Sequence, residues 1–128
     1  MLIKGQCVVP GIVKGTTIVS KEPISFLGDI DPQTGQIVAK SHPLQGEFIS
    51  DKIFVFPCGK GSTVGSYIIF QLYKNGKAPR AMINSKVEAI VAVGAIISNI
   101  PLIHEVDISK IPPNVEIFLN ATDGLIEF

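Results

Sequence analysis

The feature that most constrains this chain is a short apolar run followed directly by a glycine-rich segment and a second apolar run. Ile53-Phe54-Val55-Phe56 is continuously apolar and ends at Pro57, a pattern typical of a fully buried strand. Gly59-Lys60-Gly61-Ser62-Thr63 follows, and residues 67–74 then form a mainly apolar stretch that ends at Asn75-Gly76, a signature of a helix C-terminus. The region therefore predicts a strand, a glycine-rich loop and a helix, in that order.

The rest of the chain predicts many short strands and one further helix. Residues 6–9 and 12–19 favour strands that pair as a hairpin, because Pro10-Gly11 between them is a strong turn signal. Residues 87–98 are apolar nearly all round, and their length and alanines favour a buried helix, with a strand pair broken near Gly94 as the alternative. Shorter strands are expected at residues 36–39, 81–84, 101–103, 115–119 and 125–126. Because no repeat or linker interrupts the chain, residues 1–128 predict a single domain of mixed β/α class.

Composition and charge restrict the partners of such a domain. Apolar residues make up 46% of the chain and charged residues only 17%, so an interface with a partner chain is expected. The 11 basic and 11 acidic residues balance and form no stripe, which argues against binding to nucleic acid or to an anionic membrane. No apolar stretch approaches the roughly 20 residues of a membrane span, and the first residues lack the pattern of a signal peptide. We therefore expect a soluble cytoplasmic protein.

The two cysteines, Cys7 and Cys58, lie too far apart in sequence for a CxxC redox or metal motif. In a cytosolic chain they are expected to be free thiols rather than a disulfide. Cys58 is not favoured as a nucleophile, because no histidine is near it in the sequence. We expect no metal site within this chain.

The glycine-rich loop has two interpretations. The N–H groups of a first helical turn have no partner within the helix, and glycines let the backbone approach an anion closely, so the loop suits a phosphate or carboxylate. Lys60 would add a full positive charge, although the spacing is not that of a Walker loop. Ser62 and Thr63 also suit the N-cap of the helix, which is a purely structural role. Spacing alone leaves both interpretations open.

Several separated segments of the chain, in the right order, resemble the small subunit of the aconitase X family. The segments are residues 25–35, 42–46, 78–84 and 94–101, together with Phe56-Pro57-Cys58-Gly59-Lys60-Gly61-Ser62-Thr63-Val64-Gly65-Ser66-Tyr67. The resemblance covers nearly the whole chain. It implies the swivelling β/β/α domain of the aconitase superfamily.

The resemblance also implies a reaction and a role for the loop. The chain would be the small subunit of a heterodimeric hydro-lyase, active only with a large subunit whose own cysteines bind a [4Fe-4S] cluster. The implied reaction dehydrates (R)-5-phosphomevalonate to trans-anhydromevalonate 5-phosphate, in a variant mevalonate route to isoprenoids. Ser62 is the implied proton acceptor, and it takes a proton from the carbon next to the carboxylate. The expected substrate-binding residues are Gly59, Lys60, Gly61 and Thr63. Because a serine hydroxyl is a very weak base, helix N–H groups and Lys60 are expected to stabilise its oxyanion.

The sequence departs from the wider aconitase pattern just after the serine. Aconitases place an arginine there that grips a substrate carboxylate, whereas this chain has Val64 and Gly65. Substrate anchoring is therefore expected from Lys60, from backbone amides or from the large subunit. Two alternatives stay open: another aconitase X dehydratase, such as one acting on cis-3-hydroxy-L-proline, and a non-catalytic anion-binding or scaffold module.

Other polar residues have simpler expected roles. His42 precedes a proline in a loop and is expected to be exposed, and His104 is expected at the surface. Asp29 and Asp31 lie among glycine and proline, so we expect them to cap turns rather than to act as paired acid/base carboxylates. Arg80 follows a proline and is a weak candidate for contact with the partner or a phosphate.

Overall fold

The structure is a computed structural model that describes all 128 residues. It contains eight strands, three α-helices and one 3-10 helix. In chain order the elements are β1 (Leu2–Lys4), β2 (Gln6–Val9), β3 (Ile12–Val19), α1 (Phe26–Asp29), β4 (Ile53–Phe56), α2 (Gly65–Lys74), β5 (Ala81–Asn84), α3 (Ala89–Ser98), β6 (Leu102–His104), η1 (Ile108–Lys110), β7 (Glu116–Asn120) and β8 (Leu125–Glu127).

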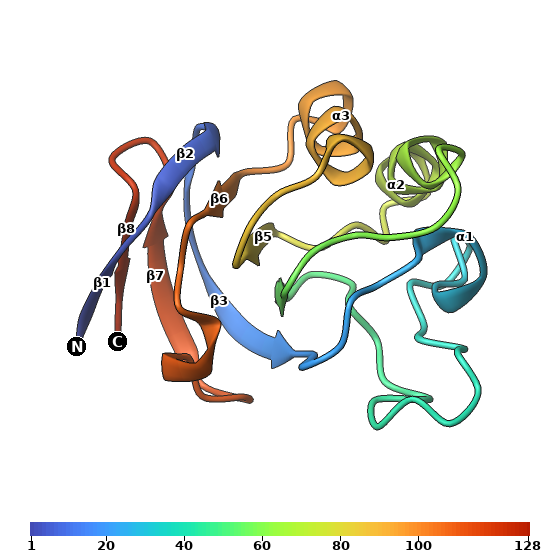
Figure 1. Ribbon diagram of the computed structural model, residues 1–128, viewed down its shortest axis with the longest axis horizontal. Helices are drawn as coiled ribbons and strands as arrows, with labels where there is room; N and C mark the ends of the chain where they lie inside the picture. The colour runs from blue at the N-terminus through green and yellow to red at the C-terminus, as the bar shows by residue number, and fades with distance from the viewer.

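All strands belong to one sheet in the order β1-β8-β7-β3-β4-β5-β6-β2. The long strand β3 joins the two halves of this sheet. Its first part pairs antiparallel with β7, and its residues 17–19 pair parallel with β4. The strands β1 and β2 lie at opposite ends of this order, yet only Gly5 separates them in the chain. The sheet therefore curls until its two edges meet at Gly5, as the strands at the left of Figure 1 show.

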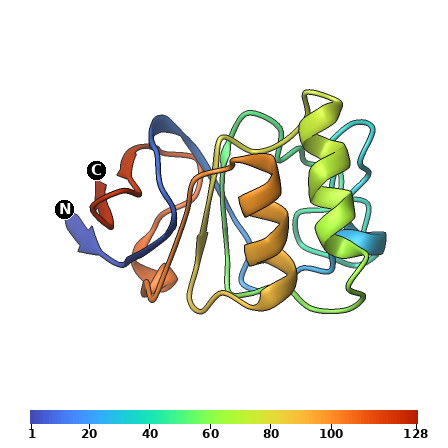
Figure 2. The ribbon, with the colours of Figure 1, turned by 90° about the horizontal axis from the view of Figure 1, so that it is seen from above.

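Two apolar cores lie on opposite faces of the central strands. One contains Phe54 and Phe56 of β4 and packs under α2 and α3, and the other contains Ile53 and Val55 and fills the curled half of the sheet. The strand β4 is buried at all four positions because both of its faces are covered, as is usual for parallel strands. Figure 2 shows α2 and α3 side by side on one face. The helices, the central strands and the curled half of the sheet thus form three layers, which confirms the expected β/β/α class.

The predicted hairpin of residues 6–9 and 12–19 is wrong, although both strands exist. β2 pairs with β6 and β3 pairs with β7 and β4, so the two strands never contact each other as a ladder. Pro10-Gly11 turns a corner of the curled sheet instead of closing a hairpin. The turn signal was local, whereas the choice of strand partner depends on residues about a hundred positions away.

Two further predictions change in the structure. Residues 36–39 form no strand: Gln36 and Ile37 make only isolated bridges, to Phe48 and to Ile30. The predicted second helix is confirmed as α3, but it is not buried all round, because its outer face leaves Val93, Ile96 and Ile97 about half exposed.

The segment that carries the site was predicted correctly. The strand β4, the glycine-rich loop and α2 follow one another, and α2 ends at Lys74 with Asn75 as its C-cap, whose N–H donates to the carbonyl of Gln71. Because β4 and β5 are parallel and each is followed by a helix, the loop lies at the carboxyl ends of these strands. That edge is where open α/β sheets usually place ligands.

Candidate functional site

The loop between β4 and α2 is fixed by backbone contacts on two sides. The carbonyl of Pro57 accepts hydrogen bonds from the N–H groups of Ser85 (3.0 Å) and Lys86 (3.2 Å), just after β5. On the other side the N–H of Ile24 donates to Cys58 (3.1 Å), and the N–H of Lys60 donates to Ile24 (3.0 Å). The loop is therefore held between two segments that are remote from it in sequence.

At two positions of the loop, close neighbours leave no room for a side chain, so glycine is required there. A Cβ at Gly59 would lie 2.3 Å from a carboxylate oxygen of Glu88, and one at Gly61 would lie 2.5 Å from Oγ of Ser25. Gly61 also has a φ of 86°, which side chains disfavour. The Glu88 carboxylate accepts hydrogen bonds from Ile90 and Val91 (both 2.8 Å) and so caps α3. The loop thus passes tightly beside the first turn of α3.

Three consecutive N–H groups of the loop have no acceptor within the chain. The N–H groups of Gly61, Ser62 and Thr63 make no hydrogen bond, and all three residues are exposed. Their position before α2, together with a positive φ at Gly61, is typical of a backbone nest that binds an anion. Gly59 is buried and the N–H of Lys60 is already used, so an anion would meet residues 61–63 first.

Neither Ser62 nor Thr63 is the N-cap that the spacing suggested, because Val64 holds that position before α2 and no side chain caps the helix. The Oγ of Ser62 accepts a hydrogen bond from the N–H of Val64 (3.2 Å), and the carbonyl of Ser62 accepts one from Gly65 (2.9 Å). These bonds shape the turn that leads into α2, so the hydroxyl has a local structural role although it does not cap the helix. The hydroxyl is nevertheless exposed and can still donate its own hydrogen, which leaves it free to meet a substrate. Lys60 is exposed beside it and forms no ion pair.

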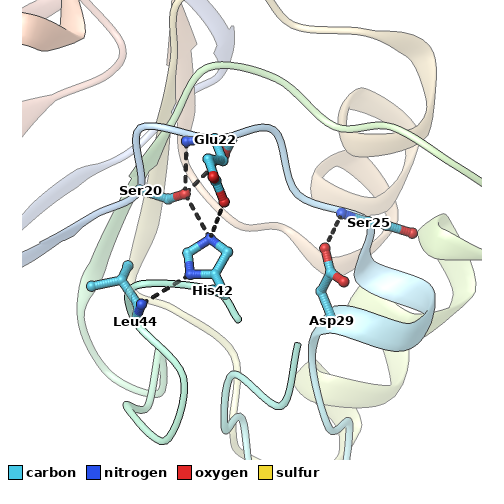
Figure 3. Close-up of polar contacts among 6 residues, drawn as sticks. All are labelled: Ser20, Glu22, Ser25, Asp29, His42 and Leu44. Carbon is cyan, nitrogen blue, oxygen red and sulfur yellow. Dashed lines mark hydrogen bonds and ion pairs between the residues drawn. The ribbon is translucent and has the colours of Figure 1, made fainter. Parts of the chain in front are cut away.

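His42 is not the exposed loop residue that we expected, since its side chain is only 6% exposed. Figure 3 shows its ring between the end of β3 and the turn at Leu44. Its Nε2 lies 3.1 Å from Oγ of Ser20 and 3.6 Å from the carboxylate of Glu22, and its Nδ1 accepts the N–H of Leu44 (3.0 Å). The sequence offers no local signal for this burial, because the partner Ser20 is 22 positions away.

The other polar residues separate into turn residues and one remote ion pair. Asp29 accepts the N–H of Ser25 (2.9 Å), as Figure 3 shows, and Asp31 accepts the N–H of Gln33 (2.9 Å), which confirms the predicted turn-capping roles. His104 is partly buried, with a side chain 20% exposed, so it is less of a surface residue than we expected.

Arg80 lies far from the loop, at the amino end of β5. Its guanidinium binds both carboxylate oxygens of Asp51, at 2.7 and 3.2 Å, and donates to the carbonyl of Lys14. The hydrogen bond from Arg80 lowers the pKa of Asp51, against the opposing effect of burial. The structure therefore gives Arg80 a local structural partner and does not bring it to the glycine-rich loop.

One buried side chain near the loop escaped the sequence analysis altogether. Asn84, the last residue of β5, is fully buried and donates from Nδ2 to the carbonyl of Phe56 (3.1 Å), at the start of the loop. Its carbonyl oxygen has no partner. Only a polar residue at the end of an otherwise apolar strand hinted at such a role.

The side chains of this chain do not offer a set of metal ligands. Both cysteines are free thiols, Cys7 lies exposed on β2, and nowhere do three or more His, Cys, Asp or Glu side chains gather closely enough to hold an ion. An iron–sulfur cluster therefore does not fit the residues of this chain. None of the helices has the length and apolar character needed to cross a membrane.

Comparison with known proteins settles the family. The sequence profile of the aconitase X swivel domain matches residues 2–128. The chain belongs to the aconitase X swivel-domain family. It is 53% identical to the phosphomevalonate dehydratase small subunit of Pyrococcus abyssi, over 99% of this chain and 98% of that one.

Solved structures agree with this family. The crystal structure of Thermococcus kodakaraensis aconitase X in its holo-form superposes with a TM-score of 0.97 at 47% identity, covering 99% of this chain and 97% of that one. A solution NMR structure of a UPF0107 protein superposes with a TM-score of 0.91 at 40% identity, covering 100% of this chain and 98% of that one. The aconitase X fold predicted from the sequence is therefore confirmed.

Proposed function

We propose that this chain is the small subunit of phosphomevalonate dehydratase, a hydro-lyase. The observation that carries the proposal is the match of about half of all residues, along the whole chain, to proteins named as that subunit. The loop geometry supports it, because an exposed serine hydroxyl lies beside unpaired N–H groups at the carboxyl edge of the parallel strands. The substrate in this proposal is (R)-5-phosphomevalonate, and the products are trans-anhydromevalonate 5-phosphate and water.

In this function Ser62 accepts the proton from the carbon next to the substrate carboxylate. A serine oxygen can do this only if its negative charge is stabilised while the proton is transferred. The N–H of Val64 already donates to Oγ of Ser62, the free N–H groups of Gly61 and Thr63 belong to the residues on either side of it, and the exposed ammonium of Lys60 adds positive potential. Fixed donors of this kind act most strongly where water is excluded.

The exposure of Ser62 supports a site that a second chain completes. In the isolated subunit the hydroxyl faces solvent, where its oxyanion would gain little from neighbouring dipoles. We therefore propose a heterodimer with a large subunit that covers the loop. We also propose that the large subunit holds the [4Fe-4S] cluster, since this chain provides no ligand set for it.

The direct experiment is the variant Ser62→Ala, assayed with the large subunit and (R)-5-phosphomevalonate. We expect kcat to fall by a factor of about 10³ or more, in the range seen when an essential group for proton transfer is lost. An unchanged kcat would reject Ser62 as the base. A matched control is Ser50→Ala, which removes a hydroxyl that donates to the carbonyl of Thr34 at the opposite end of β4. This control is expected to keep wild-type turnover.

A second substrate tests the reaction itself. The same reconstituted enzyme is assayed with cis-3-hydroxy-L-proline, the substrate of the alternative that the sequence left open. Turnover of hydroxyproline without turnover of phosphomevalonate would reject the proposed substrate while leaving the family and Ser62 intact.

A further inference from the structure

The buried imidazole of His42 has a defined hydrogen-bonding state. Its Nδ1 accepts the N–H of Leu44, so Nδ1 carries a lone pair and the ring proton lies on Nε2. Nε2 therefore donates to Oγ of Ser20 at 3.1 Å. The same Oγ donates to the carbonyl of Glu22 (2.8 Å) and accepts its N–H (3.1 Å). The ring thus links the turn at Leu44 to the chain just after β3.

The turn that presents His42 holds an uncommon backbone conformation. Ser41, directly before the histidine, has a φ of 65°, in the left-handed region that residues other than glycine rarely adopt. Such conformations persist only where the surrounding structure fixes them, and they cluster at functional positions. Here the result is a ring held almost entirely out of solvent between two loop segments, as Figure 3 shows.

The segment that His42 binds is the one on which the glycine-rich loop rests. Residues 21–23 between β3 and Ile24 are exposed and bury nothing of their own. The next residue, Ile24, exchanges backbone hydrogen bonds with Cys58 and Lys60, and Ser25 packs against Gly61. The course of residues 20–25 therefore sets where the loop, and with it the hydroxyl of Ser62, is placed.

From this chain of contacts we infer that His42 is a positioning residue for the catalytic loop, acting through the bond from its Nε2 to Ser20. His42 holds residues 20–25 in place, and these residues hold the backbone of the loop. The inference rests on the proposed role of Ser62 as the base. Because proton transfer is sensitive to displacements of about 1 Å, loss of the bond lowers kcat by roughly tenfold to a hundredfold without changing substrate binding.

Two conservative variants separate the two bonds of the ring. In His42→Asn the side-chain oxygen takes the place of Nδ1 and still accepts from Leu44, but no group reaches Ser20. In His42→Gln the amide N–H reaches the place of Nε2 and still donates to Ser20. We expect kcat with the large subunit to fall by about tenfold or more in His42→Asn, with KM unchanged, and to stay within about threefold of wild type in His42→Gln.

Ser20→Ala provides the reciprocal test, since it removes the acceptor. Because Ser20→Ala also removes both bonds between Oγ and the backbone of Glu22, we expect kcat to fall at least as far as in His42→Asn. The combined variant should be no slower than Ser20→Ala alone, because that change already removes the bond to His42. The control Ser50→Ala removes a comparable hydroxyl-to-carbonyl bond at the other end of the sheet and leaves kcat unchanged. The inference is overturned if His42→Asn keeps wild-type kcat, or if His42→Gln is as slow as His42→Asn.

A readout that does not depend on catalysis separates this inference from the proposed function. In amide NMR spectra of the full chain, His42→Asn is expected to shift the resonances of Lys60, Gly61 and Ser62, whereas Ser50→Ala leaves them in place. If these amides do not move, the positioning role fails even where Ser62→Ala abolishes turnover. If they move and Ser62→Ala stays active, the positioning role stands and the assignment of the base fails.

Discussion

The tight passage of the loop beside α3 makes Gly59→Ala an informative change. The new Cβ would lie 2.3 Å from Oε1 of Glu88 and 2.6 Å from a methyl carbon of Val91. Neither distance is tolerated, so either the loop moves or the Glu88 carboxylate leaves its place. That carboxylate accepts the N–H groups of Ile90 and Val91, so its displacement also removes the cap of α3.

The magnitude follows from the two losses. An N-cap interaction contributes about 0.5–2 kcal/mol to stability. A methyl group forced into a packed region costs about 1–3 kcal/mol, because neighbours must leave their preferred rotamers. We therefore expect Gly59→Ala to lower the free energy of unfolding by about 1.5–5 kcal/mol. Glu88→Ala alone removes only the cap and is expected to cost about 1 kcal/mol.

Equilibrium unfolding in urea measures these free energies. An unchanged m-value would show that each variant exposes as much surface on unfolding as the wild type does. The double variant Gly59→Ala/Glu88→Ala is the decisive control. Since the carboxylate is absent from it, the closest contact disappears, and the double variant should lose clearly less stability than the sum of the single variants. A loss in Gly59→Ala below about 0.5 kcal/mol, or strict additivity in the cycle, would refute the assigned contact between the loop and the α3 cap.

Three further changes test other parts of the structure. Gly61→Ala places a side chain at a φ of 86° and 2.5 Å from Oγ of Ser25. We expect the free energy of unfolding in urea to fall by about 1–2 kcal/mol and kcat to fall as well. An unaltered kcat would contradict the tight placement of the loop. Asp51→Asn removes the partner of Arg80. Because the folded-state pKa of Asp51 is lowered from 3.8, the stability that the carboxylate adds is present above pH 3.8 and is lost as pH falls through the lowered pKa. Wild type should therefore be more stable than the variant at about pH 7, and the difference in the free energy of unfolding should shrink as the pH falls below 3.8. Ile96→Lys changes a side chain that is 59% exposed on α3, so the free energy of unfolding should change by no more than about 0.5 kcal/mol; a larger loss would show that this face is packed in the isolated chain.

The region around the loop could be predicted because its signals are local. Four apolar residues ending at Pro57, a pair of glycines and the pair Asn75-Gly76 lie within one short stretch, and each restricts the backbone of its own neighbourhood. A strand, loop and helix follow directly from such restrictions. The structure then adds that the exposed hydroxyl of Ser62 closes the turn before α2 and that Val64 is the N-cap, which spacing alone could not decide.

The strand partners could not be predicted in this way. Every strand edge offers the same backbone N–H and carbonyl groups. The local sequence pattern of a strand therefore does not indicate which other strand it will pair with. The turn signal at Pro10-Gly11 was real, yet β2 lies against β6 and β3 lies against β7, since closure of the curled sheet buries more apolar surface than an isolated hairpin could.

By itself, then, the sequence determined the local chemistry of this protein: a serine in a glycine-rich loop before a helix, in an order of segments that resembles aconitase X. Only the tertiary structure decided which groups surround that loop. Ile24 binds it through backbone hydrogen bonds, His42 binds Ser20 in the segment that leads to Ile24, and Glu88 packs on Gly59. Such contacts form when the whole sheet closes and the chain brings distant residues together, so no window of neighbouring residues contains the information that specifies them.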